Sequence, residues 1–323
     1  MTTNLSLSHV IGIDMGGTNT SFGIVDARGE ILKRGAIKTT KHESIDSYID
    51  ELYAGLEPLI KEVGGIEKIK GIGMGAPNAN YYTGNIEFAP NLPWQGVIPI
   101  ANLLAAKFKI PTAVTNDANA AAVGEMTYGA ARGMKDFIMI TLGTGVGSGI
   151  VANGQLIYGY DGFAGELGHT TIVRNNGRLC GCGKYGCLET YASATGVART
   201  AREILETRND DSSLRSVTLD NITSKDVFDA AIAGDIIAKE IFEYTGKMLG
   251  EAFADFVAFS APEAIILFGG LTKSGNLILN PIREHMEKNL LKIWKGKIKI
   301  LFSSLSEADS AVLGASALGW EAK

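Results

Sequence analysis

The sequence predicts an α/β fold built from two similar halves that face a central cleft. Three observations support this prediction. Glycine is frequent, with 40 residues in a chain of 323, which is about 12% against a usual ~7%. The glycines are clustered, and the clusters at 16–17 and 143–149 each follow a short apolar run typical of a buried strand. In both places a second strand follows and returns through a turn, so the two halves resemble each other.

The first half begins with strands that are joined by tight turns. Apolar runs predict strands over 9–14, 21–25 and 31–39. The residues from Asp26 to Gly29 between the last two strands indicate a hairpin. Apolar residues at three- and four-residue steps then predict a helix over 45–63, which Gly64-Gly65 ends. The remaining elements expected here are a strand, a helix, a strand and a helix, over 69–74, 100–108, 112–115 and 118–127.

The second half repeats the opening of the first. We expect a strand over 136–142, then the glycine loop, then a second strand and turn within 149–158. The polar, irregular segment 207–222 predicts a surface loop. Thr223 to Asp226 resembles a capping box that opens one long helix to about residue 257. The chain is expected to close with strand 264–268, helix 281–292, strand 298–302 and helix 308–319.

Composition excludes several classes of function. The net charge is −5 and the pI about 5.5, so the basic face that a nucleic acid or anionic membrane would need is not expected. The first eight residues lack the basic and apolar segments of a signal peptide. No apolar run reaches the ~18–20 residues that span a bilayer. We therefore expect a soluble, cytoplasmic protein of about two domains, without nucleic-acid or membrane partners.

The two glycine loops are candidates for binding phosphate. Glycine lets backbone N–H groups approach an anion without an intervening Cβ. The first loop, Asp14 to Thr18, would use Gly16 and Gly17 in this way, and the Asp14 carboxylate suits Mg²⁺. The second loop would use Gly143, the Thr144 hydroxyl and Gly145 from the other side. Neither loop is a Walker A or dinucleotide motif, and ordinary glycine-rich turns remain an alternative.

The sequence Asn116-Asp117 stands where a strand becomes a helix. Asp and Asn are preferred helix N-caps, so a capping role is one interpretation. The functional interpretation makes Asp117 a general base that accepts the proton of an attacking hydroxyl.

A compact group of metal ligands lies between residues 169 and 187. His169 is followed by Cys180, Cys182 and Cys187, all three cysteines of the chain. Three thiolates and one imidazole suit tetrahedral Zn²⁺, and a complete shell of four protein ligands predicts a structural site. Three core cysteines beside an unrelated histidine are the alternative.

Two glutamates flank this group. Glu166 lies three residues before His169, and Glu189 lies two residues after Cys187. A metal-stapled loop would hold both carboxylates rigidly, where they could accept hydrogen bonds from sugar hydroxyls. Solvated surface glutamates are the alternative.

Together these motifs resemble the ROK family of sugar kinases and sugar-responsive repressors, in particular its bacterial glucokinases, over nearly the whole chain. The resemblance implies the actin-like ATPase fold, with a small domain (1–116 plus 308–323) and a large domain (117–307). It implies transfer of the γ-phosphate of ATP to a hexose, with glucose expected, and a homodimer. Kinases for N-acetylmannosamine, fructose or allose, a non-catalytic sugar sensor, a chaperone-type ATPase and a repressor are the alternatives. Only thirteen residues precede the first loop, which disfavours a DNA-binding domain.

The resemblance also implies roles for individual residues. Asp117 looks like the catalytic base, and the two glycine loops look like the phosphate loops. The residues similar to the family's sugar-binding set are Gly75, Asn78, Asn91, Asn116, Asp117, Glu166, His169 and Glu189. Gly269 and Gly270 resemble the contact to adenosine. Asn78 departs from the glycine usual in family glucokinases and adds a side chain beside the sugar pocket, so the preferred hexose stays open.

Overall fold

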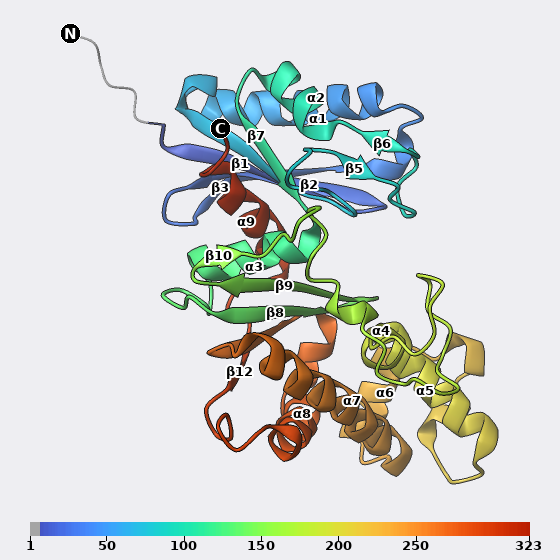
Figure 1. Cartoon of the computed structure of the whole chain (residues 1–323). Helices are drawn as coiled ribbons and strands as arrows, with labels where there is room; N and C mark the ends of the chain where they lie inside the picture. The colour runs from blue at the N-terminus through green and yellow to red at the C-terminus, as the bar shows by residue number, and fades with distance from the viewer. Residues whose placement is uncertain (1–6) are drawn as a thin grey trace.

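The computed structural model describes residues 7–323 of the chain. Residues 1–6, in which we expect no signal peptide, lie outside the described part. Two five-stranded sheets dominate the structure, one above the other in Figure 1. None of the helices in the described part combines the length and the apolar character needed to cross a bilayer.

The first sheet has the strand order β3-β2-β1-β4-β7. Its strands are β1 (His9–Met15), β2 (Asn19–Asp26), β3 (Ile31–Lys38), β4 (Ile69–Gly75) and β7 (Thr112–Thr115). The first three form an antiparallel meander, whereas β4 and β7 run parallel to β1. Parallel strands place their carboxyl ends at one edge of the sheet, which is where ligands bind in open α/β sheets.

The second sheet repeats this topology as β10-β9-β8-β11-β12. Its strands are β8 (Phe137–Leu142), β9 (Val146–Ala152), β10 (Gln155–Leu156), β11 (Ala264–Phe268) and β12 (Lys299–Phe302). Strands β8, β9 and β10 are antiparallel neighbours, and β11 and β12 run parallel to β8. The predicted similarity of the two halves is therefore confirmed at the level of strand order and direction.

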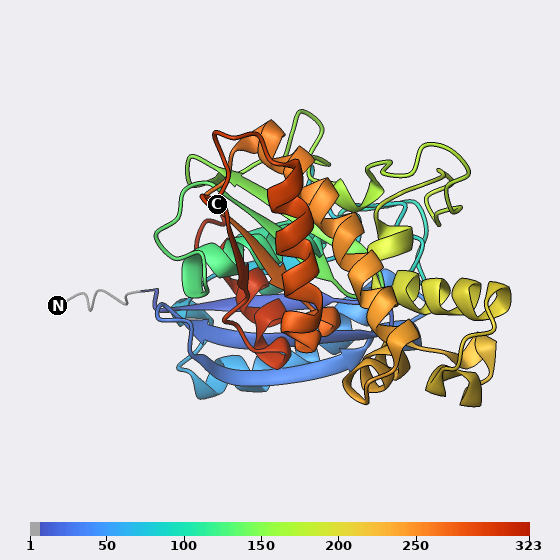
Figure 2. The same ribbon diagram turned by 90° about the horizontal axis from the view of Figure 1, so that it is seen from below.

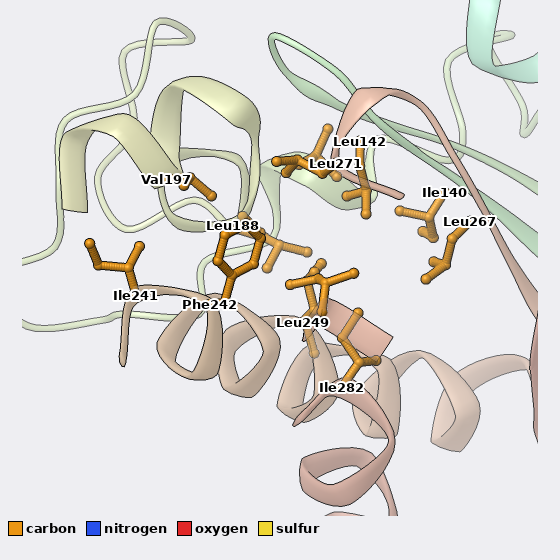
Figure 3. Packing of buried hydrophobic residues seen from close by; sticks show 14 of the residues in the cluster. Ile140, Leu142, Leu188, Val197, Ile241, Phe242, Leu249, Leu267, Leu271 and Ile282 are labelled. Carbon is orange, nitrogen blue, oxygen red and sulfur yellow. The ribbon is translucent and has the colours of Figure 1, made fainter. Parts of the chain in front are cut away.

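Helices cover the outer face of each sheet. On the first sheet, α1 (Ile45–Glu62) and α2 (Ile100–Phe108) bury a core that includes Tyr48, Leu52 and Leu104. On the second, α7 (Ile236–Ser260) and α8 (Asn276–Asn289) lie side by side (Figure 2). Figure 3 shows how residues of α7 and α8 pack against side chains from β8 and β11 to form the larger core. The short sheet of β5 (Ile86–Glu87) and β6 (Val97–Ile98) was not predicted.

Two helices fill the space between the sheets in Figure 1, α3 (Asp117–Tyr128) and α9 (Glu307–Gly319). Helix α9 packs on β1 and β4, and α3 packs on β9. The two helices cross at Gly124 and Gly314, where a Cβ added to Gly124 would lie 2.7 Å from the Gly314 Cα. The last helix thus returns to the first sheet. The division of the chain into domains at residues 116 and 308 remains a prediction.

The structure corrects two predictions for the segment 207–257. The long helix from 224 to 257 is two helices, α6 (Ser224–Ile232) and α7, because Gly234 at φ +102° and the N-cap Asp235 separate them. The capping box of Thr223 and Asp226 is confirmed. Segment 207–222 is not only a surface loop, since Leu214 and Ile222 are buried in the larger core.

Three further helices differ from the sequence analysis. Helix α8 begins at Asn276 and not at Pro281, which is the sixth residue of the helix. Helices α4 (Glu189–Ala192) and α5 (Ala194–Thr207) were not predicted. Helix α4 is important for the site, because it begins with one of the candidate glutamates.

Candidate active site

The carboxyl ends of three parallel strands bring the first acidic residues together. Asp14 on β1 pairs with Gly75 on β4, and Gly75 pairs with Thr115 on β7. A Cβ on Gly75 would lie 3.6 Å from the Cα of Asp117 and 3.9 Å from Oδ1 of Asp14. Burial, and then the nearby carboxylate of Asp117, raises the pKa of Asp14 to about 6. The two carboxylates therefore share one small region at the edge of the first sheet.

The structure separates the two roles that the sequence left open for Asn116-Asp117. Asn116 is the N-cap of α3, and its Oδ1 accepts a hydrogen bond of 2.7 Å from the backbone N–H of Asn119. Asp117 is the first helical residue and is exposed, with Oδ1 2.8 Å from the N–H of Ala118. The capping interpretation thus applies to Asn116, and the Asp117 carboxylate is left accessible.

Asp117 faces a crevice of about 540 Å³. Most of the candidate site residues line it, although they come from distant parts of the chain. These are Asn78, Asn91, Asn116, Asp117, Gly143, Thr144, Gly145, Glu166, His169, Glu189 and Gly269. The candidates that do not line it, among the described residues, are Asp14, Gly16, Gly17, Thr18, Gly75, Gly270 and the three cysteines.

The first glycine loop adjoins this crevice from behind Asn91. The loop is the tight turn between β1 and β2, in which the N–H of Gly16 donates to the carbonyl of Asn19 (2.9 Å). A Cβ on Gly17 would lie 2.6 Å from the carbonyl oxygen of Asn91. Since Asn91 lines the crevice, the loop and the crevice are direct neighbours, and Gly17 is required for their contact. The Thr18 carbonyl is occupied by the N–H of Thr39.

The second glycine loop joins β8 to β9 and forms one wall of the crevice. Its turn is closed by a hydrogen bond of 3.1 Å from the N–H of Gly143 to the carbonyl of Gly145. Thr141, at the end of β8, accepts the N–H of Gly147 with its hydroxyl (3.1 Å). Gly269, at φ +106°, packs against the backbone of Leu142, beside the start of this loop.

The Glu189 carboxylate connects the metal-ligand loop with the second glycine loop. Its Oε2 accepts the N–H of Val146 at 3.0 Å, and Oε1 lies 3.7 Å from the Cys180 sulfur. A Cβ on Gly145 would clash with Oε2. Glu189 thus lines the crevice, and one of its carboxylate oxygens is already occupied by a backbone hydrogen bond.

Glu166 is held by a residue that the sequence analysis missed. The buried Ser148 hydroxyl donates to the carbonyl of Gly165 and accepts the N–H of Leu167 at 3.1 Å. It is therefore hydrogen-bonded to the backbone on both sides of Glu166. The signal was present, since Ser148 stands where a dinucleotide motif would have its third glycine. Burial raises the pKa of Glu166, whose Oε2 lies 3.9 Å from Nε2 of His169.

The four candidate metal ligands converge. One ligand atom from each of His169, Cys180, Cys182 and Cys187 lies within 4.8 Å of all the others. Nδ1 of His169 is 3.7 Å from the Cys180 sulfur, and the sulfurs of Cys182 and Cys187 are 3.7 Å apart. Zn–S bonds of ~2.3 Å in a tetrahedron would place two sulfurs about 3.8 Å apart. The donor set and its spacing therefore fit Zn²⁺, with Nε2 of His169 left to face Glu166.

Asn78 occupies the third position of a tight turn. The N–H of Ala79 donates to the carbonyl of Ala76 (3.2 Å), Pro77 follows Ala76, and Asn78 has φ +50°. These features are typical of a type II turn, which favours glycine or asparagine at this position. The Asn78 amide donates to the carbonyls of Glu87 (3.0 Å) and Phe88 (3.3 Å), so it braces the segment that leads to Asn91.

Comparison with known proteins relates this sequence to one family. A sequence model of the ROK family matches residues 10–322. A glucokinase of Halalkalibacterium halodurans is 39% identical over 319 residues, covering 97% of this chain and 94% of that protein. A glucokinase of Thermotoga maritima is 33% identical over 311 residues, covering 96% of each chain.

A solved structure extends the likeness to three dimensions. The ROK family glucokinase from Streptomyces griseus, in complex with glucose and AMPPNP, is 33% identical with a TM-score of 0.79. The match covers 97% of this chain and 99% of that one. It confirms the expected actin-like ATPase fold, whose repeated sheets are those described above. The chain belongs to the ROK family.

Proposed function

We propose that this chain is an ATP-dependent glucokinase that transfers the γ-phosphate of ATP to the 6-hydroxyl of glucose. The observation that carries the proposal is the placement of Asp117. Its accessible carboxylate and the second glycine loop line one crevice, and the first glycine loop adjoins that crevice through Asn91. The named relatives are glucokinases, and the similar solved structure holds glucose and an ATP analogue.

Asp117 acts as the general base in this mechanism. Its carboxylate accepts the proton of the sugar 6-hydroxyl while that oxygen attacks the γ-phosphorus, and the bond from the γ-phosphorus to the bridging oxygen of ADP breaks. The position of Asp117 in the first turn of α3 favours a negative charge, because the helix macrodipole is positive there. The carboxylate is also exposed and lines the crevice before the sugar binds.

The two glycine loops bind the ATP phosphates from opposite sides in this proposal. Gly16, Gly17 and Thr18 contribute from the first sheet, and Gly143, Thr144 and Gly145 contribute from the second. Mg²⁺, which neutralises phosphate charge when bound, would be held by Asp14. The close approach of the Asp14 and Asp117 carboxylates fits a cation at this edge of the sheet. Gly269 and Gly270 follow the end of β11, and we assign to them the contact with adenosine.

The sugar hydroxyls are bound by the amides and carboxylates of the opposite wall. We assign this role to Asn91, Asn116, Glu166, His169 and Glu189. Gly75 and Asn78 would shape the tight turn that follows β4. Asn116 caps α3 with its Oδ1, so its NH₂ group is the part that remains for the sugar. His169 would contact the sugar with Nε2, because Nδ1 faces the cysteines.

We further propose that His169, Cys180, Cys182 and Cys187 hold a structural Zn²⁺. Burial raises the pKa of Cys180 and Cys187, so these thiols would stay protonated unless a cation stabilised their thiolates. With four protein ligands the ion would have no open position for catalysis. Its function is to hold Glu166, His169 and Glu189 in one rigid loop.

The proposal includes a cytoplasmic homodimer. Use of ATP and three unpaired cysteines suit a reducing compartment. An apolar groove beside α7, where Phe259 is 87% exposed next to Phe256 and Ile138, supports the dimer. Light scattering of the purified chain measures its oligomeric state.

A coupled assay of ADP formation, run with and without sugar, tests the activity. We expect ADP formation to depend on glucose, with lower kcat/KM for N-acetylmannosamine, fructose and allose. Sugar-independent ATP hydrolysis at the same rate would support a chaperone-type ATPase. Sugar binding without ADP formation would support a sensor and would contradict the proposal.

A further inference from the structure

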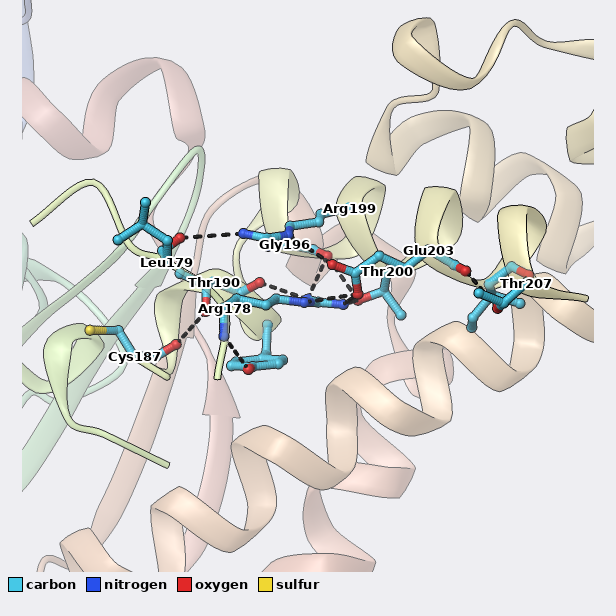
Figure 4. A network of polar contacts seen from close by, with 11 residues as sticks. Arg178, Leu179, Cys187, Thr190, Gly196, Arg199, Thr200, Glu203 and Thr207 are labelled. Atoms are coloured by element: carbon cyan, nitrogen blue, oxygen red, sulfur yellow. Dashed lines mark hydrogen bonds and ion pairs between the residues drawn. The ribbon is translucent and has the colours of Figure 1, made fainter. Parts of the chain in front are cut away.

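A buried arginine lies beside the metal-ligand loop and has no part in the chemistry proposed above. Arg178 is two residues before Cys180, and only 8% of it is exposed. Figure 4 shows its guanidinium between the loop, α4 and α5. A buried guanidinium is costly unless its donors are satisfied, so its partners indicate its function.

Every part of the Arg178 guanidinium has an acceptor. Nη1 donates to the carbonyls of Thr190 (2.7 Å) and Gly196 (3.5 Å), and Nη2 donates to the Thr200 hydroxyl (2.9 Å). Nε and Nη2 both donate to Oε2 of Glu203 (3.1 and 2.5 Å). The side chain therefore ties α4 to two turns of α5.

The backbone of Arg178 is tied to the same segment. Its N–H donates to the Tyr191 hydroxyl at 2.9 Å, while its guanidinium lies 4.5 Å from the centre of the Tyr191 ring. Its carbonyl accepts the N–H of Gly186 at 2.8 Å. Arg178, which precedes the three cysteines, thus contacts Gly186 between them and Tyr191 after them, and it closes the loop independently of any metal.

Arg178 contacts residues that lie on both sides of Glu189 in the sequence. Glu189 stands between Cys187, a metal ligand, and Thr190, whose carbonyl Arg178 holds. The Glu189 carboxylate in turn binds the N–H of Val146 in the second glycine loop. A shift of Thr190 and Tyr191 would therefore move Glu189 away from the crevice and would loosen Cys187.

We infer that Arg178 is a positioning residue, which holds Glu189 at the sugar and the cysteines in ligand geometry by clamping Thr190 and Tyr191 from behind. This inference rests on the proposed function for its effect on sugar binding, and on the four ligands for its effect on the metal.

Arg199 offers a matched control. It donates to Oε1 of the same Glu203 at 2.9 Å and, at the surface, to the carbonyl of Leu179 at 3.3 Å. Its side chain is 41% exposed, and its hydrogen bonds go to neither Thr190 nor Tyr191. An exposed pair of this kind contributes little. Arg199→Gln thus removes a guanidinium from Glu203 and leaves the clamp on α4 in place.

The experiment compares the parent protein with Arg178→Gln, Arg178→Lys and Arg199→Gln. The first readout is the rate at which each zinc-loaded protein releases zinc to a chromogenic chelator, without sugar or ATP. The second is the KM for glucose and kcat. Residues that support metal ligands affect affinity by ~10–100-fold when replaced. We expect Arg178→Gln to release zinc about tenfold faster and to raise the glucose KM about tenfold, with kcat changed less than ~3-fold.

The other variants give the test its specificity. Arg178→Lys keeps the charge but lacks the planar fork, so it should give intermediate values in both readouts. Arg199→Gln should stay within about twofold of the parent. If Arg178→Gln does not fold, the lysine variant decides the question alone. A lower melting temperature in either variant, with parental zinc release and glucose KM, would reduce Arg178 to a purely structural residue and overturn the inference.

The two proposals fail in distinguishable ways. A parent protein that holds zinc but does not phosphorylate glucose would contradict the proposed function, and the zinc-release comparison would still test the clamp.

Discussion

Replacing Asp117 by Asn should leave the fold intact and remove most of the catalysis. The substitution keeps the size of the side chain and an Oδ1 that can accept the N–H of Ala118. The helix start does not depend on it, because Asn116 is the cap of α3. The cost to stability is limited to the loss of one negative charge in the first helical turn, about 0.3–1 kcal/mol.

The effect on the reaction should be far larger. A general base contributes ~10²–10⁴ in rate, which corresponds to about 2.7–5.4 kcal/mol of barrier. Asp117 is accessible in the crevice, and of the described residues that line it, only Glu166 and Glu189 carry another carboxylate. Glu189 is already bound to Val146. We therefore expect kcat to fall at least ~10²-fold while glucose still binds.

Steady-state kinetics and glucose binding by calorimetry measure the two effects separately. Asp46→Asn is a suitable control, since Asp46 is an exposed acid in the first turn of α1 and lies outside the crevice. Turnover of the Asp117 variant within a few-fold of the parent would remove Asp117 from the role of base. Loss of glucose binding together with kcat would instead show that the carboxylate mainly holds the sugar.

Two further predictions concern the loops around the sugar. Asn78→Gly should leave the free energy of unfolding nearly unchanged, because two effects offset each other. The substitution removes two exposed hydrogen bonds, and it also removes the strain of a left-handed backbone conformation, which costs about 1 kcal/mol. We expect the glucose KM to rise a few-fold as the segment before Asn91 loosens, with the order of preferred hexoses unchanged. A broader sugar range at constant glucose KM would instead show that the Asn78 side chain excludes other hexoses sterically. Elemental analysis of protein purified without added metal should find about one zinc per chain, and Cys182→Ser should lower that content and the melting temperature. Absence of zinc from the parent protein would contradict the metal assignment.

The sequence predicted the strands better than the helices, for physical reasons. Apolar runs such as that of β8 are short, fully buried and bounded by glycine or polar residues, so their limits are clear. The division between α6 and α7 is weaker in the sequence, because apolar positions continue across it. There the N–H of Asp235 donates to the carbonyl of Ala230 (3.0 Å), as in a helix that ends in a Schellman motif, and the same aspartate caps the next helix.

The candidate site was predictable where one residue type suits one chemistry. Three cysteines and a histidine in a short glycine-rich segment suit metal binding better than any other chemistry, and the structure brings all four together. The supporting residues could not be found in this way. Ser148 and Arg178 act through hydrogen bonds to backbone groups, and those groups become neighbours only after the chain has folded. Ser148 is marked only by its place in the second glycine loop, and nothing in the local sequence distinguishes Arg178 from an arginine on the surface.

The crossing of α3 and α9 has a consequence for how the enzyme can open. At Gly124 and Gly314 the helices meet backbone to backbone, and the small cluster of Ala120, Val123, Ala317 and Leu318 packs beside this crossing. One helix packs on the first sheet and the other on the second, and neither glycine lines the crevice. The two sheets are thus connected through a close helix crossing that lies away from the reacting atoms. A single methyl group placed there would push the two helices apart and change the access of substrate to the crevice without contacting the substrate.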